Sequence, residues 1–183
     1  MSPPAEYSAA ERALLLDTAH RAIAATLAGE HDLALPEATA HLSQARGAFT
    51  TLHLEGQLRG CVGYVIAAKP LIRTVAETAI AAAFQDPRFP AVTRAEAPRL
   101  KIEISVLSLP QPMRAEEIVA GRHGLIVSLG PRRGLLLPQV AEEHGWDAPV
   151  FLAQTCRKAG LPPDAWQRGA TIEAFTAEVF GEE

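Results

Sequence analysis

Two Gly-bounded turns constrain the fold of this sequence more than any other feature. The first is GQLRG at 56–60 and the second is GPRRG at 130–134. Each turn joins two runs of strand-forming residues, and a helical pattern and a further strand follow. The later strands also match, since one opens with KIE at 101–103 and the other with TIE at 171–173. The sequence therefore predicts an internal hairpin-helix-strand repeat, and hence an α+β fold of two unequal subdomains with mainly antiparallel sheet.

The spacing of apolar residues places the individual elements along the chain. Ser8 and Glu11 have the spacing of a capping box, which predicts a helix over 9–28. A hairpin with its turn at 55–57 follows, because strand-forming runs flank that turn. The other predicted elements are strands at 49–54, 58–66, 101–108, 125–127, 135–137 and 171–179, and helices at 70–86, 138–144 and 148–159.

Length and charge narrow the class of protein. A chain of 183 residues is predicted to form one domain over 8–180, whose halves, about 8–112 and 113–180, share one core. The net charge of −4 gives no basic field for nucleic acid over the whole chain. A local basic face stays open as an alternative, since 14 of the 17 basic residues are Arg, but the net charge does not support nucleic-acid binding.

The sequence points to no metal, cofactor or membrane span. Cys61 and Cys156 are too few for a disulfide framework and stand outside any metal-ligand spacing. The glycine motifs that hold nucleotide phosphates do not occur. No apolar run approaches the roughly 18–20 residues of a transmembrane helix, and no basic leader precedes one. We therefore expect a cytoplasmic protein without a metal or a cofactor.

The densest group of candidate functional residues is LRGCVG at 58–63. Glycine inside a strand often marks a place where another group approaches the backbone closely, so Gly60 and Gly63 are candidate substrate-binding positions. Arg59 carries a fixed positive charge near Cys61, and a nearby cation favours the nucleophilic thiolate. The alternative is that Cys61 is a small apolar side chain packed between glycines.

His53 and Glu103 are candidates for proton transfer. If the hairpin turns at 55–57, His53 lies near Cys61 across the hairpin and would serve as its base. A register shift of one residue would place the two on opposite faces. Glu103 lies in an otherwise apolar strand, where a carboxylate facing a pocket would act as an acid or a base. In both cases the alternative is a polar residue on the solvent side of a sheet.

Asp86 and Arg88 form a further candidate pair in the turn DPRF at 86–89. A turn fixed by proline would present the carboxylate and the guanidinium to one ligand. The alternative is that the two side chains pair only with each other where the preceding helix ends. The sequence leaves both interpretations open.

Further motifs occur in order along the chain: DPRFP at 86–90, IEISVL at 102–107, GLLLPQV at 134–140, GWD at 145–147 and CRKAGLP at 156–162. With LRGCVG, they resemble the AMMECR domain family over about 8–180. Its bacterial and archaeal members are called AmmeMemoRadiSam system protein A. The resemblance implies an α+β fold with two unequal subdomains and an internal repeat. It also implies two partners, a Memo-like protein and a radical S-adenosylmethionine protein, but no established reaction.

These observations lead to two hypotheses. In the first, the protein is an enzyme whose cleft is lined by Arg59, Cys61, Asp86, Arg88 and Glu103. Cys61 is the nucleophile or acid, Glu103 or His53 carries the proton, and the two arginines hold an anionic substrate. In the second, the protein is a scaffold that docks the Memo-like or radical S-adenosylmethionine partner, and Cys61 is a packing residue. The first hypothesis requires Cys61 and Glu103 to share one face of the sheet.

Overall fold

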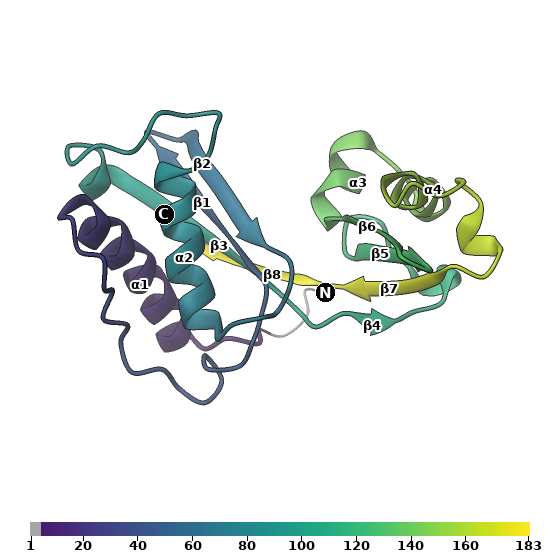
Figure 1. Ribbon diagram of the computed structural model, residues 1–183, viewed down its shortest axis with the longest axis horizontal. Coiled ribbons are helices and arrows are strands. Elements are labelled where there is room, and N and C mark those ends of the chain that lie inside the picture. Colours follow the sequence, from purple (N-terminus) through teal and green to yellow (C-terminus); the bar gives the residue numbers. More distant parts are fainter. Residues whose placement is uncertain (1–4) are drawn as a thin grey trace. The chain divides into compact units, whose positions relative to one another are not determined.

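The computed structural model describes residues 5–183, which form two compact units (Figure 1). Unit 1 contains the chain up to Leu107 and also the last segment, Glu178–Glu183. Unit 2 contains Ser108–Ala177. The halves predicted at 8–112 and 113–180 differ from these units, because the last segment of the chain returns to unit 1. Each unit has buried apolar clusters of its own, and a core shared by the two halves stays a prediction.

Unit 1 consists of a four-stranded sheet with two helices on one of its faces (Figure 1). The sheet has the order β2-β1-β3-β8, and β1 pairs antiparallel with both β2 and β3. The predicted α+β class with antiparallel sheet is confirmed. The elements are α1 (Ala9–Leu27), β1 (Ala48–Leu54), β2 (Gln57–Tyr64), α2 (Leu71–Phe84), the 3-10 turn η1 (Ala97–Arg99), β3 (Leu100–Leu107) and β8 (Ala177–Gly181).

Local sequence accounts for the first helix and for the hairpin. The Ser8 hydroxyl accepts a hydrogen bond from Glu11 N, and the Glu11 carboxylate accepts one from Ser8 N, so the predicted capping box is confirmed. The hairpin turns through two residues, Glu55 and Gly56, which have φ of 53° and 78°. Two successive positive φ values match the twist of the flanking strands. The turn is shorter than predicted because Gln57 already pairs within the ladder.

Alternation along the strands gives the sheet of unit 1 two different faces. On the face toward α1 and α2, Leu52, Ile102 and Ile104 belong to one apolar cluster and are almost fully buried. The Thr50 hydroxyl lies on the same side, 2.8 Å from the hydroxyl of Thr78 on α2. The residues between these positions form the opposite face, which carries the candidate site.

Unit 2 contains a second sheet, in the order β4-β7-β5-β6. In both units the first hairpin strand lies between the second hairpin strand and a strand that follows the helices: β2-β1-β3 in unit 1 and β6-β5-β7 in unit 2. The elements are β4 (Gln111–Pro112), η2 (Ala115–Glu117), β5 (Gly124–Leu129), β6 (Arg132–Leu136), α3 (Pro138–His144), α4 (Ala148–Lys158), η3 (Ala165–Gln167) and β7 (Thr171–Phe175).

The predicted last strand, 171–179, is divided into β7 and β8. The break falls at Thr176, whose backbone N–H and C=O form hydrogen bonds to Ser108 and not to a neighbouring strand of either sheet. Ser108 N donates to Thr176 O at 2.8 Å, and Thr176 N donates to Ser108 Oγ at 2.9 Å. These two bonds replace the ladder bonds that a continuous strand would make.

Candidate functional site

One row across the sheet of unit 1 brings together a thiol, a hydroxyl and a carboxylate. Thr51 of β1 pairs with Cys61 of β2 on one side and with Glu103 of β3 on the other. All three residues are half-buried and lie on the face opposite α1 and α2. The Thr51 hydroxyl donates a hydrogen bond to Cys61 Sγ at 3.3 Å. Cys61 and Glu103 thus share one face, and Thr51, which the sequence analysis did not single out, lies between them.

His53 lies on the same face as Cys61 but not beside it. His53 pairs with Leu58 and Lys101, one row closer to the hairpin turn. The register of β2 shifts between this row and the next, as it does at a β-bulge. Thr51 is therefore the cross-strand neighbour of the Cys61 thiol, and within residues 5–183 no hydrogen bond joins His53 to Cys61. The predicted role of His53 as the base gains no support from this geometry.

At both glycines of the motif, other groups of the protein pack closely against the backbone. A Cβ atom at Gly60 would lie 2.1 Å from the carbonyl oxygen of Ala82, because α2 crosses β2 at this point. A Cβ atom at Gly63 would lie 2.3 Å from the ring of Phe49, its partner on β1. The close approach predicted at both glycines is real, but groups of the protein itself make it. No pattern in the sequence singles out Phe49.

Asp86 holds the edge of β2 at Cys61. Its carboxylate accepts hydrogen bonds from Cys61 N at 3.0 Å, from Arg88 N and Nε at 3.0 Å, and from Arg88 Nη2 at 2.7 Å. The Arg88 guanidinium, followed by the Cys61 amide, holds the pKa of Asp86 well below its usual range. Its side chain is only 3% exposed, so Asp86 positions the Cys61 backbone as an anion and is not a proton donor near neutral pH.

Arg88 presents a guanidinium next to the Cys61 strand. Its side chain is 56% exposed although it pairs with Asp86, and its guanidinium carbon lies 5.4 Å from the centre of the Phe89 ring. The pKa of Arg88 is raised, chiefly by its hydrogen bonds to Asp86. Since Nη1 has no hydrogen-bond partner among residues 5–183, Arg88 has a donor left for an anionic group.

Arg59 has a different role from the predicted anion-binding one. Its guanidinium pairs with Glu96 through Nε–Oε1 at 3.0 Å and Nη2–Oε2 at 3.2 Å, and Nη1 donates to Pro90 O at 2.9 Å. The Arg59 side chain is only 10% exposed. Arg59 lowers the pKa of Glu96 to about 2, with help from the Thr93 amide. Its donors face the segment around 90–96, so Arg59 fastens that segment to β2, and of the two arginines Arg88 is the exposed one.

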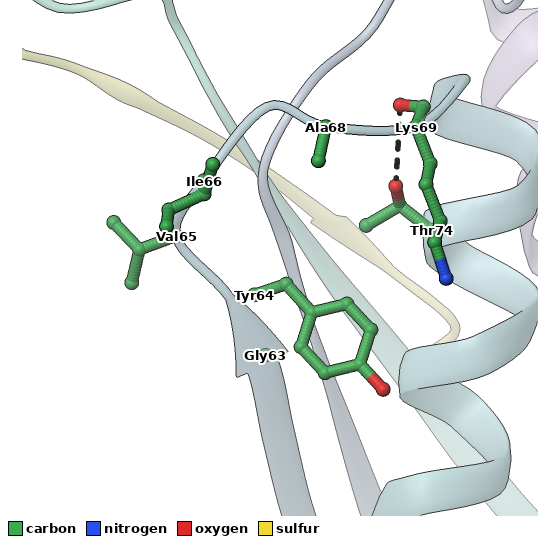
Figure 2. A pocket seen from close by; sticks show the side chains of 7 residues that line it. All are labelled: Gly63, Tyr64, Val65, Ile66, Ala68, Lys69 and Thr74. Atoms are coloured by element: carbon green, nitrogen blue, oxygen red, sulfur yellow. Dashed lines mark hydrogen bonds between the residues drawn. The ribbon is translucent and has the colours of Figure 1, made fainter.

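A pocket of about 520 Å³ opens at the end of β2 (Figure 2). The Lys69 ammonium pairs with Glu77 at 2.7 Å and the Thr74 hydroxyl donates to Lys69 O at 3.4 Å, which leaves a largely apolar wall. The sequence analysis missed this pocket, because a loop without periodicity forms much of it. The lining residues are Gly63, Tyr64, Val65, Ile66, Ala68, Lys69 and Thr74.

Cys156 differs from Cys61 in its surroundings. It is fully buried in unit 2, and burial raises the pKa of its thiol. Over residues 5–183, no three His, Cys, Asp or Glu side chains gather as metal ligands would. In the same part of the chain, no helix has the length and apolar character needed to cross a bilayer.

Comparison with known proteins places the chain among archaeal relatives. The AMMECR1 family model matches residues 16–180. A protein of Methanothermobacter thermautotrophicus is 45% identical, with 98% of each chain covered, and one of Pyrococcus furiosus is 45% identical over 78% of this chain and 73% of its own. The crystal structure of an uncharacterised protein of Pyrococcus horikoshii, PH0010, has a TM-score of 0.75 and 41% identity, and covers 92% of this chain and 90% of its own.

Proposed function

Because the chain belongs to the AMMECR1 family, we propose that it is the A component of an AmmeMemoRadiSam-type three-protein system and that it acts there as an enzyme with Cys61 as its nucleophile. The observation that carries this proposal is the row Cys61–Thr51–Glu103 on one face of the sheet. A thiol, a hydroxyl and a carboxylate lie side by side along this row, and nucleophilic catalysis with proton transfer uses groups of these kinds. The substrate and the reaction stay open.

Each residue of the site has one role in this proposal. Thr51 donates a hydrogen bond to Cys61 Sγ and so orients the sulfur within the row. Glu103, on the far side of Thr51, exchanges a proton with the bound substrate, because two strand spacings of about 4.8 Å each separate it from Cys61. The exposed guanidinium of Arg88 binds an anionic group of the substrate. Asp86 fixes the Cys61 amide and so keeps the thiol at one place on the sheet edge.

Unit 2 supplies an internal comparison that supports the functional interpretation. In its sheet, Ile126 pairs with Leu135 on one side and with Glu173 on the other, as Thr51 pairs with Cys61 and Glu103. We propose that the two hairpin-helix-strand arrangements are an internal repeat. In unit 1, α2 crosses β2 at Gly60, and in unit 2 the end of α4 lies against β6 at Gly134. A Cβ atom at Gly134 would lie 2.3 Å from Ala159 N. At the place of the thiol and the hydroxyl, unit 2 has leucine and isoleucine. The fold itself therefore does not require Cys61 or Thr51.

The partners and the compartment belong to the proposal as well. We propose that the chain works with a Memo-like protein and a radical S-adenosylmethionine protein, as the family resemblance implies, and that it does so in the cytoplasm. The free thiols of Cys61 and Cys156 fit a reducing compartment, where a nucleophilic thiol is not lost to a disulfide.

The alternative is a scaffold without catalysis, and one observation favours it. Tyr64 and Ile66 on the rim of the pocket in Figure 2 are 39% and 77% exposed. Exposed apolar side chains beside an apolar hollow are typical of a surface that contacts a partner. In a scaffold, the Gly-flanked strand shapes this surface and Cys61 is packing.

Extracts of the native organism distinguish the two functions. Three strains are compared with wild type by untargeted mass spectrometry: one that lacks the chain, one with Cys61→Ser and one with the control Cys156→Ser. An enzyme predicts that the Cys61→Ser strain accumulates and lacks the same small molecules as the strain without the chain, while the control resembles wild type. A Cys61→Ser strain that resembles wild type would overturn the enzymatic proposal. Co-purification of the partners with Cys61→Ser protein would then support the scaffold.

A further inference from the structure

The row next to Cys61 gives the proposed site an aromatic wall. Phe49 pairs with Gly63, which lies two residues along β2 from Cys61 and on the same face. Two residues of a strand span about 6.7 Å, so a ring at this place contacts a group of moderate size bonded to the sulfur. The ring leans toward β2 rather than β3, since a Cβ atom at Gly63 would lie 2.3 Å from it.

The row on the other side of Cys61 has the opposite character. His53 lies in its centre, with the exposed Lys101 next to it on β3 and the apolar Leu58 next to it on β2. A molecule that lies along β1 and β3 therefore meets an aromatic ring at one end and the polar groups of His53 and Lys101 at the other. The Cys61 thiol stands between the two. This polarity orients a substrate along the sheet.

We infer that Phe49 determines the specificity of Cys61, and that the substrate is an electrophile with a flat apolar group beside its reactive carbon. The inference rests on the proposed function, because it needs Cys61 to react. In the covalent step the sulfur forms a bond to the electrophilic carbon, and the π bond of that carbon breaks. The atom that receives the π electrons takes up the proton released by the thiol, so the step needs no oxidant or reductant.

The expected size of the preference follows from the contact that Phe49 offers. An aromatic pair in offset or edge-to-face contact changes an equilibrium or a rate by a factor of about 2 to 12 beyond its area burial. Because Gly63 has no side chain, the Phe49 ring packs directly against the backbone of β2 and is held there. A fixed ring loses little conformational freedom when a substrate group packs on it.

Two maleimides test the inference on the intact protein. The rate constant of Cys61 with N-phenylmaleimide is divided by that with N-ethylmaleimide, and the same ratio is measured for glutathione, which corrects for intrinsic reactivity. Both reactions add sulfur to one alkene carbon and a proton to the other. Mass spectrometry follows Cys61 and Cys156 separately. We expect the ratio for Cys61 to exceed that of glutathione by about 2- to 12-fold and to fall to the glutathione value in Phe49→Leu.

Phe175→Leu is the matched control variant. In unit 2, Phe175 pairs with Gly124, and a Cβ atom at Gly124 would lie 2.2 Å from its ring. The control therefore removes a ring from the same setting without touching the Cys61 row, and its ratio should equal that of wild type. The wild-type ratio is informative even if Phe49→Leu does not fold.

A Cys61 that is inert toward both maleimides in the native protein overturns the proposed function, and the inference with it. A reactive Cys61 with the ratio of glutathione overturns the inference alone and leaves a reactive thiol. A raised ratio that persists in Phe49→Leu removes Phe49 as the determinant.

Discussion

The partly buried ion pair between Arg59 and Glu96 leads to a quantitative prediction for Glu96→Gln. The Glu96 carboxylate accepts two hydrogen bonds from Arg59 and further ones from the amide and hydroxyl of Thr93. Glutamine keeps the shape of the side chain and an acceptor oxygen, but it removes the negative charge. The Arg59 side chain, only 10% exposed, is then left with a weaker partner. Unit 1 should therefore lose stability near neutral pH.

The magnitude follows from the pKa of Glu96, which is lowered from 4.5 to about 2, chiefly by Arg59. One pKa unit corresponds to about 1.4 kcal/mol, so the shift sets an upper limit of about 3 kcal/mol. The Glu96 side chain is 22% exposed, and solvent screening reduces the expected loss to about 2 kcal/mol. Because the folded pKa is lowered, this contribution is complete above about pH 5 and disappears as the pH falls toward 2. The difference between wild type and Glu96→Gln should shrink over the same range.

Hydrogen exchange of amides in β2 and α2 measures the free energy of opening unit 1. Both tryptophans, Trp146 and Trp166, lie in unit 2, so their fluorescence is a separate probe of that unit. We expect Glu96→Gln to lower the opening free energy of β2 by about 2 kcal/mol at pH 7 and to leave the tryptophan emission of the native protein unchanged. Equal protection at pH 7, or a difference that grows in acid, would refute the role given to this pair.

Three further substitutions probe packing and the site. Gly60→Ala should destabilise unit 1 by about 2–3 kcal/mol in a denaturant titration, because its Cβ would meet backbone oxygen of Ala82 at 2.1 Å; a change below about 0.5 kcal/mol would show that α2 moves aside freely. Thr51→Val removes the donor to Cys61 Sγ and should slow alkylation of Cys61 at pH 7 by about tenfold; an unchanged rate would exclude that role. Arg88→Gln should slow the reaction with anionic iodoacetate more than that with neutral iodoacetamide, and an equal effect on both would contradict an anion-binding guanidinium.

Much of the fold follows from local sequence. The apolar period of α1 and the spacing of Ser8 and Glu11 place that helix within one residue of its observed end. The Gly-containing turn between β1 and β2 likewise predicts the hairpin. Local rules fail for the last strand, because the break at Thr176 depends on Ser108, a residue distant in sequence.

The candidate site is predictable only in part, since its contacts join distant segments. Alternation within β3 placed Glu103 on one face, but only the pairing of three strands puts Thr51 between it and Cys61. The shift in register near the turn, which the sequence does not show, places Cys61 opposite Thr51, and His53 pairs with Leu58 instead. Arg59 beside Cys61 in sequence favoured an activating cation, yet its partner, Glu96, lies far along the chain.

The covering of Gly63 by Phe49 was equally hidden from a sequence reading. A glycine in a strand indicates that something approaches the backbone, but the pattern does not say what. The register of the hairpin identifies the ring as that group. Such cross-strand pairs become predictable once the register is known.

The alkylation rate of Cys61 in the native protein tests the central claim most directly. Iodoacetamide is added over a range of pH, and mass spectrometry reads Cys61 and the buried Cys156 in one sample. The account predicts that Cys61 reacts at pH 7 at least about ten times faster than glutathione, as an activated thiolate does, while Cys156 reacts only after unfolding. A Cys61 that reacts only when Cys156 does would contradict it and identify a structural thiol.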